Sequence, residues 1–117
     1  VYIVTNGTSS TQYKRLALSG IDKFVRDVFV SEDAGSQKPQ QAYFDYCFAR
    51  MPGILPERTL LVGDSLTSDI QGGLGAGCHV CWYNPGGQPL PEEVRPDFVV
   101  RTLGEVRKIL ERDAEIF

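Results

Sequence analysis

No stretch of this 117-residue sequence approaches the roughly 20 apolar residues that a membrane-spanning helix needs, and no basic leader precedes an apolar core and cleavage site. Basic residues are not in excess either, since 12 Lys and Arg against 15 Asp and Glu give a formal net charge of -3. Polyanion binding needs a dense basic surface, so this balance argues against general nucleic-acid binding, although a small anion could still bind locally. We therefore expect a cytoplasmic protein with neither a membrane nor a nucleic-acid partner.

Cysteine and histidine are also scarce, with three cysteines and one histidine. An odd cysteine count without secretory features argues against a disulfide framework. Cys78 and Cys81 have the spacing of a metal or redox pair, but they fall on a predicted strand, where positions three apart face opposite sides. No second pair completes a zinc site, so neither zinc nor redox chemistry is the expected function.

Short apolar runs alternate with helical patterns, which predicts a β-α-β-α order. The runs are nearly continuously apolar, as in parallel strands that helices cover on both faces. We expect strands at 2–5, 28–31, 59–63, 79–83 and 98–100, and helices at 10–19, 40–51, 67–76 and about 103–112. The predicted fold class is therefore α/β, with a doubly wound, Rossmann-like parallel sheet, and 117 residues leave room for one domain.

Thr5-Asn6-Gly7 follows the first predicted strand and leads into a helix. In doubly wound sheets ligands bind at the carboxyl ends of the strands, so a hydroxyl and backbone amides here could hold a phosphate. Gly7 would permit close approach of the backbone. An Asn-Gly pair is also a common turn, and Ser9 or Ser10 could simply cap the helix, so the motif alone leaves both interpretations open.

Lys38 lies directly before Pro39 and the helix predicted from Gln40. A lysine near a helix N-terminus is unfavourable by about 0.3–1 kcal/mol unless an anion binds between them. The position therefore indicates an anion site, and a solvated surface lysine is the alternative.

Asp64 follows the strand that ends at Gly63, and Asp69 lies in the first turn of the next helix. Mg²⁺ usually takes one or two carboxylates together with water and phosphate oxygens, so this pair suits it. Asp69 could instead satisfy the start of the helix, with Ser65 or Thr67 as the cap. Asp64 directly follows a buried strand and must be paired, metal-bound or hydrated.

In this order, the three motifs resemble motifs two, three and four of the haloacid dehalogenase-like (HAD) superfamily. Within it, the chain is most similar to phosphatases of nucleotides or small phosphorylated metabolites, including the noncanonical pyrimidine nucleotidases. The resemblance implies that Thr5 and Lys38 are catalytic and that they bind the phosphate with Asn6 and Gly7. It further implies that Asp64 binds a Mg²⁺ cofactor directly, while Asp69 orients what the metal holds.

One family motif is absent, because Asp-x-Asp occurs nowhere in the sequence. In the family this motif supplies the nucleophile and the acid/base partner, on a strand between those that end here at Thr5 and Gly63. The chain also opens without Met in the strand-like run Val1–Val4. We therefore expect residues 1–117 to be the C-terminal part of a HAD-like core domain, inactive alone, with the nucleophile strand and any cap upstream. The segment from Thr5 to Lys38 is too short to contain a cap.

The resemblance implies Mg²⁺-dependent hydrolysis of a small phosphomonoester through an aspartyl-phosphate, whose aspartate lies outside this chain. Several alternatives stay open, among them a phosphomutase with the same core residues and a non-catalytic regulatory module descended from such an enzyme. A haloacid dehalogenase would not need a metal. The Gly63-Asp64 motif resembles a metal-ligand motif and therefore disfavours this alternative. A receiver-type signalling domain would place its acidic pair first in the sequence. The natural substrate and the oligomeric state are not indicated.

Overall fold

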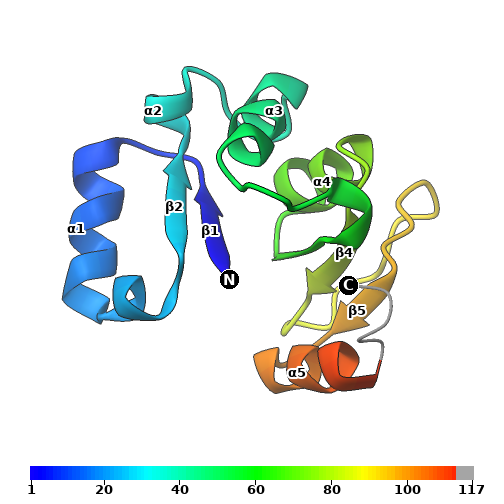
Figure 1. Ribbon diagram of the computed structural model, residues 1–117. Coiled ribbons are helices and arrows are strands. Elements are labelled where there is room, and N and C mark those ends of the chain that lie inside the picture. Colours follow the sequence, from blue (N-terminus) through cyan, green and yellow to red (C-terminus); the bar gives the residue numbers. More distant parts are fainter. Residues whose placement is uncertain (113–117) are drawn as a thin grey trace. The chain divides into compact units, whose positions relative to one another are not determined.

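The computed structural model describes residues 1–112 and divides the chain into two compact units, Val1–Met51 and a second that begins at Pro52. Each unit combines helices with parallel strands, so the predicted α/β class is confirmed (Figure 1). The strands form two sheets, with the order β1-β2 in the first unit and β3-β4-β5 in the second.

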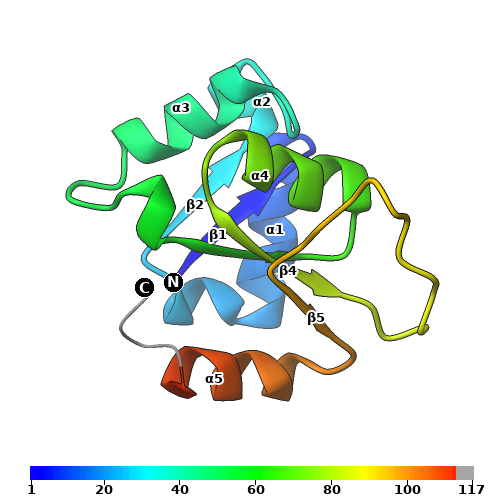
Figure 2. The same ribbon diagram turned by 90° about the vertical axis from the view of Figure 1, so that its right-hand side faces the viewer.

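In the first unit, strands β1 (Tyr2–Thr5) and β2 (Asp27–Val30) pair in parallel, with Thr5 opposite Val30. Their carboxyl ends therefore lie at the same edge of the sheet, as the arrowheads in Figure 2 show. Helix α1 (Ser9–Ser19) and the short helix η1 (Ile21–Phe24) connect the strands, and α2 (Ser31–Ala34) and α3 (Gln41–Ala49) follow β2. The loop between β1 and α1 lies at this carboxyl edge.

The core of the first unit is formed by β2 and α3. Apolar residues three and four positions apart give α3 one apolar face, as predicted, and that face is buried. The helix ends at Ala49, earlier than expected. The buried apolar side chains of the unit are Phe29, Val30, Tyr43, Phe44, Cys47 and Met51.

In the second unit, β4 (His79–Tyr83) is the middle strand between β3 (Leu60–Gly63) and β5 (Phe98–Val100), all parallel. A short helix, η2 (Pro56–Arg58), precedes β3, and α5 (Leu103–Arg112) follows β5. The segment between β3 and β4 forms a π-helical stretch, η3 (Leu66–Gln71), and then α4 (Gly72–Gly75). The sequence predicted a single helix over 67–76, so this part of the prediction was too simple.

Two apolar clusters cover this second sheet. Val80 and Trp82 of β4 pack with Ile70 and Val94, whereas Cys81 packs with Val100 and Ile109. Because successive residues of a strand point to opposite faces, the clusters lie on opposite faces of the sheet. This two-sided burial explains why β4 is continuously apolar in sequence.

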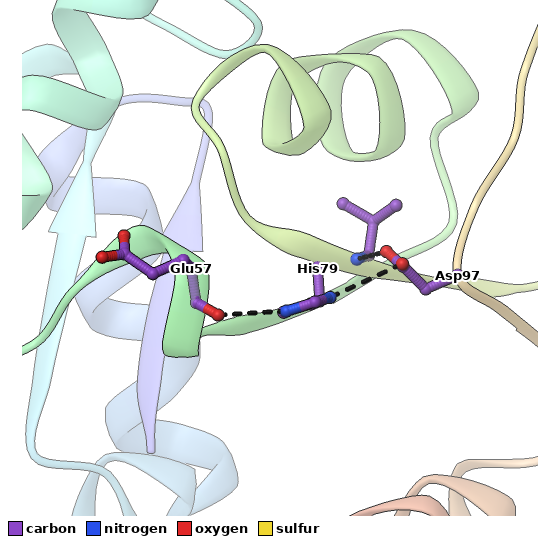
Figure 3. A network of polar contacts seen from close by, with 4 residues as sticks. Glu57, His79 and Asp97 are labelled. Atoms are coloured by element: carbon purple, nitrogen blue, oxygen red, sulfur yellow. Dashed lines mark hydrogen bonds and ion pairs between the residues drawn. The ribbon is translucent and has the colours of Figure 1, made fainter. Parts of the chain in front are cut away.

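The single histidine, at the start of β4, contacts both the η2 segment and the residue before β5 (Figure 3). His79 Nε2 lies 3.0 Å from the Glu57 carbonyl oxygen, and Nδ1 lies 3.5 Å from Asp97 Oδ1. The other oxygen of Asp97 accepts a hydrogen bond from the Val80 N–H at 2.8 Å. His79 opens β4, so it lies at the end of the sheet opposite to the carboxyl end of β3, and its contacts are structural.

Candidate active site

The first unit brings together the four residues predicted to bind phosphate. The Asn6 side-chain amide donates to the Lys38 carbonyl at 3.2 Å, and its oxygen accepts from the Lys38 backbone N–H at 3.0 Å. Both ends of the amide are thus used on the backbone of Lys38. The Asn6 side chain therefore connects the Thr5-Asn6-Gly7 motif to Lys38. The contact with phosphate that the sequence predicted is assigned to the backbone N–H of Asn6, and it remains a prediction.

Lys38 is only 9% exposed, so the alternative of a solvated surface lysine is wrong. Its ammonium group donates to the Val4 carbonyl at 3.3 Å, beside the end of β1. Lysine is rarely buried unless it has a partner, and this position places its positive charge next to the Thr5-Asn6-Gly7 loop. The location is suitable for neutralising a bound anion.

Ser31 and Gln12 hold the same loop from the other elements of the unit. The Gly7 N–H donates to Ser31 Oγ at 2.9 Å, and the Ser31 hydroxyl donates back to the Gly7 carbonyl at 3.2 Å. Gly7 has φ +145°, a conformation that favours glycine. Gln12 Nε2 donates to the Asn6 carbonyl at 2.8 Å and to Thr5 Oγ1 at 3.2 Å. Neither residue could be identified from sequence, because no local pattern marks either one.

A buried tyrosine connects the ends of the two strands. The Thr5 N–H donates to the hydroxyl of Tyr43 at 3.1 Å, and that hydroxyl donates to the Phe29 carbonyl at 2.6 Å. Tyr43 has no exposed surface. The position of Thr5 at the end of β1 therefore depends on Tyr43 of α3, which is 38 residues away in sequence.

Hydrogen bonds from α2 continue along the outside of the loop. Glu32 accepts from the Ser9 N–H, and Asp33 accepts from the hydroxyls of Ser9 and Tyr13. These two hydroxyls lower the pKa of Asp33, while the hydrogen bond to Asp33, together with burial, raises the pKa of Tyr13 to about 12. The N-cap of α1 is Thr8, without a side-chain cap hydrogen bond, so the capping alternative for Ser9 or Ser10 is wrong.

In the second unit, both aspartates predicted for the metal site follow β3, with Asp64 as the next residue and Asp69 within η3. Asp64 is exposed, and its backbone carbonyl accepts a hydrogen bond from Trp82 Nε1 at 3.0 Å. Asp69 is only 6% exposed, and its Oδ2 accepts from the Ser65 N–H at 3.2 Å. Ser65 is the helix cap, as one alternative proposed, because its Oγ accepts from the Ser68 N–H at 3.1 Å.

Gly63 makes room for the Asp69 carboxylate. A Cβ atom at position 63 would lie 2.3 Å from Asp69 Oδ2 and 2.5 Å from Asp69 Cβ, which is closer than real contacts allow. The Asp69 side chain is therefore seated against the backbone of Gly63, beside the first peptide groups of the loop. Asp64, in contrast, is exposed.

The donors after β3 suit Mg²⁺. Within residues 1–112, no three His, Cys, Asp or Glu side chains are grouped so that they could hold a metal ion by themselves. Mg²⁺ does not require such a group, because it commonly takes one or two carboxylates and completes its shell with water and phosphate oxygens. The exposed carboxylate of Asp64 is a hard oxygen ligand of this kind, and Asp69 braces the loop that carries it.

Residues 36–106 match the family model described as HAD-hydrolase-like. The chain belongs to the HAD-like hydrolase family. This assignment confirms the resemblance drawn from the three motifs, of which Lys38-Pro39 and Gly63-Asp64 lie inside the matched region. No helix within residues 1–112 of this HAD-like chain is long and apolar enough to cross a membrane.

Three curated relatives are informative for this HAD-like chain. It is 53% identical to YfnB of Bacillus subtilis, 35% identical to the pyrimidine 5'-nucleotidase PynA of Streptococcus pneumoniae, and 36% identical to the pyrimidine 5'-nucleotidase YjjG of Escherichia coli. The matches cover 94%, 97% and 92% of this chain but 47%, 48% and 48% of those proteins. The chain therefore spans about half the length of the curated relatives it matches.

A solved structure of YfnB, described as bound to magnesium, has a TM-score of 0.91 with this chain. The structural match covers 93% of this chain and 48% of the YfnB chain. The α/β fold of this chain is therefore similar to that of a solved HAD-hydrolase structure.

Proposed function

We propose that the protein containing this chain is a Mg²⁺-dependent phosphomonoester hydrolase that acts on a nucleotide or a small phosphorylated metabolite. The observation that carries this proposal is the buried Lys38, whose ammonium group lies beside the Thr5-Asn6-Gly7 loop and whose backbone is bound by Asn6. The Lys38 ammonium group donates to the Val4 carbonyl and keeps its positive charge beside this loop, where it would neutralise an anion bound at the end of β1. The names of the relatives PynA and YjjG support a nucleotide as the substrate class.

Each residue has a separate task in this proposal. The Thr5 hydroxyl and the Asn6 backbone N–H donate to oxygens of the transferring phosphoryl group, and Lys38 neutralises its charge. Phosphoryl transfer depends chiefly on positioning and charge neutralisation, so fixed donors are effective. Asp64 would hold the metal ion, and Asp69 would fix the loop of Asp64. When bound, Mg²⁺ supplies further positive charge to the phosphate oxygens.

The nucleophile is proposed to lie outside this chain, on an aspartate that forms an aspartyl-phosphate which water then hydrolyses. Within residues 1–112, β1 pairs with β2 alone and β3 with β4 alone, and every residue of β1 and β3 is only partly buried. Both strands thus have an edge that another strand could occupy. This supports our proposal that residues 1–117 are the C-terminal part of the core domain.

The test measures hydrolysis of p-nitrophenyl phosphate by the whole protein, with Mg²⁺ and with a chelator. We expect activity only with the metal, and a loss of at least about 100-fold in Asp64→Ala, the scale seen when one electrostatic contact to a reacting group is removed. Asp22→Ala, at an exposed aspartate of η1, serves as the control and should retain activity. Turnover without metal would contradict the proposal, and turnover by residues 1–117 alone would contradict a nucleophile outside the chain.

A further inference from the structure

We propose that Gln12 is a positioning residue, which keeps the Thr5 hydroxyl oriented as a hydrogen-bond donor toward the substrate phosphate. The inference rests on the proposed function and deepens it, because it concerns the same phosphate loop. Gln12 lies in the first turns of α1 and is partly buried, whereas Thr11 and Tyr13 on either side are exposed. Helical side chains lean toward the helix N-terminus, which brings this one back over the loop.

The hydrogen bonds of Gln12 fix which end of its amide faces the loop. The Asn6 carbonyl can only accept, so the amide nitrogen must face it, at 2.8 Å. The same nitrogen lies 3.2 Å from Thr5 Oγ1. An amide nitrogen carries two hydrogens, and each has an acceptor here. Gln12 thus approaches Thr5 as a donor, and Thr5 Oγ1 is the acceptor.

This arrangement decides what the Thr5 hydroxyl can do. A hydroxyl has one hydrogen, so Thr5 must direct its own hydrogen elsewhere once Gln12 donates to its oxygen. In the structure that hydrogen is directed to the Asn6 carbonyl over a long 3.3 Å contact. Gln12 bonds the same carbonyl at 2.8 Å. When the hydroxyl turns to a phosphate oxygen, the Asn6 carbonyl therefore still accepts the hydrogen bond from Gln12. The turn leaves this carbonyl with a hydrogen-bond donor.

The loop is shaped to accommodate this side chain. A Cβ atom at Gly7 would lie 2.6 Å from Gln12 Nε2 and 3.1 Å from both Cδ and Cγ. The Gln12 side chain therefore lies flat against the backbone of Gly7. Ser31 bonds Gly7 through both its N–H and its carbonyl, which holds the glycine in place beneath Gln12. Such a fixed contact suits a positioning role.

The decisive experiment is a double-mutant cycle in the whole protein, with p-nitrophenyl phosphate and Mg²⁺. Gln12→Met keeps the length of the side chain and removes both donors, and we expect kcat/KM to fall about 10-fold, the factor that corresponds to one ordinary hydrogen bond. In a Thr5→Val background the same change should cost less than about 2-fold, because Gln12 then has no hydroxyl to orient. In Thr5→Ser, which keeps the hydroxyl, the effect of about 10-fold should return. Gln41→Met, at an exposed glutamine of α3, is the matched control.

The variant Gln12→Glu sharpens the test. A carboxylate can only accept, so it would take the hydrogen of the Thr5 hydroxyl and also repel the phosphate. We expect a loss larger than that of Gln12→Met, together with weaker inhibition by orthovanadate. If Gln12→Met fails to fold, as judged by circular dichroism, Gln12→Glu should cost more in the Thr5→Ser background than in Thr5→Val, because the repulsion of phosphate is common to both and only the bond to the hydroxyl differs. Equal costs would contradict the inference.

Two results would overturn this inference while leaving the proposed function intact. One is an active wild type in which Thr5→Val is impaired but Gln12→Met is not. The other is a Gln12→Met effect of equal size in the Thr5→Val and Thr5→Ser backgrounds, which would mark Gln12 as a purely structural residue. An inactive wild type would instead contradict the proposed function.

Discussion

The loops that follow β1 and β3 carry the predicted ligands, but they are built in different ways. The loop after β1 is held by Ser31, Lys38 and Tyr43, which lie between 24 and 38 residues away in sequence from the loop residues that they bond. In the loop after β3, the side-chain bonds of Ser65 and Asp69 join residues three or four positions apart. The first loop is thus a product of the tertiary structure of its unit, and the second is largely specified by its local sequence.

This difference has consequences for how each loop responds to mutation. The loop after β3 should be sensitive at the few positions that shape it, because the bonds of Ser65 and Asp69 described above are local, although Trp82 also bonds the Asp64 carbonyl from β4. Several elements support the loop after β1. The loss of one hydrogen bond there should therefore lower the free energy of unfolding by a smaller amount, and it should affect the stability of the whole unit.

The largest effect on stability is expected from Gly63→Ala in the loop after β3. The new Cβ would overlap Asp69, which is buried and too short to move away, and would strain its bond to Ser65. We expect a loss of about 3 kcal/mol in the free energy of unfolding, at the upper end for an overpacked site. Urea denaturation of the purified protein measures it.

Gly75→Ala is the matched control for this substitution. Gly75 lies in α4, and an added Cβ would meet no atom within 4 Å. Alanine is favoured over glycine in a helix by about 0.5–1 kcal/mol, so this variant should be unchanged or slightly more stable. Equal stability of Gly63→Ala and Gly75→Ala would show that Asp69 is not seated as described, and the contrast between the loops would fail.

A smaller loss is expected from Tyr43→Phe, which tests the long-range support of the loop after β1. The substitution keeps the buried ring but removes the hydroxyl that bonds the Thr5 N–H and the Phe29 carbonyl. Leaving buried backbone groups without partners costs about 2 kcal/mol. Tyr46→Phe on the same helix should change the free energy of unfolding by less than about 0.5 kcal/mol. A Tyr43→Phe variant as stable as Tyr46→Phe would mean that water replaces the hydroxyl and that the loop does not rely on α3.

The same contrast explains which parts of the molecule could be predicted from sequence. The strands at 79–83 and 98–100 and the helix at 103–112 have the predicted bounds, because each has an unambiguous apolar pattern. The short helix α2 was missed, since four polar and small residues carry no periodicity. The π-helical turn of η3 was predicted as an ordinary helix because both have similar apolar spacing.

The candidate site shows the same limit. Gly63 and Asp64 could be recognised as a distinct motif because the loop after β3 is defined by neighbouring residues. The burial of Lys38 could not be predicted, because it depends on contacts with β1, and its sequence neighbourhood did not argue against a solvated surface lysine. Gln12 and Ser31 lacked any sequence signal, because their roles come from hydrogen bonds that exist only in the folded unit.

The smallest effect is expected at the outer edge of the loop after β1, where Tyr13 bonds Asp33 near the surface. The pKa of Tyr13 is raised to about 12, so its contribution to stability is complete below its ordinary value of 10 and is lost as the pH rises from there toward 12. The pKa of Asp33 is lowered, so its contribution is present above the ordinary carboxyl range and is lost as the pH falls through the lowered value.

Phenolate absorbance at high pH measures this interaction, with Tyr13 isolated as the difference between the wild type and Tyr13→Phe. In Asp33→Asn we expect that difference to titrate closer to pH 10, because its main cause, the hydrogen bond to the carboxylate, is gone. Asp45→Asn, at an exposed aspartate that bonds Gln41 instead, should leave it near 12. If Asp33→Asn has no effect, Tyr13 is not a residue through which α2 holds the outside of the loop.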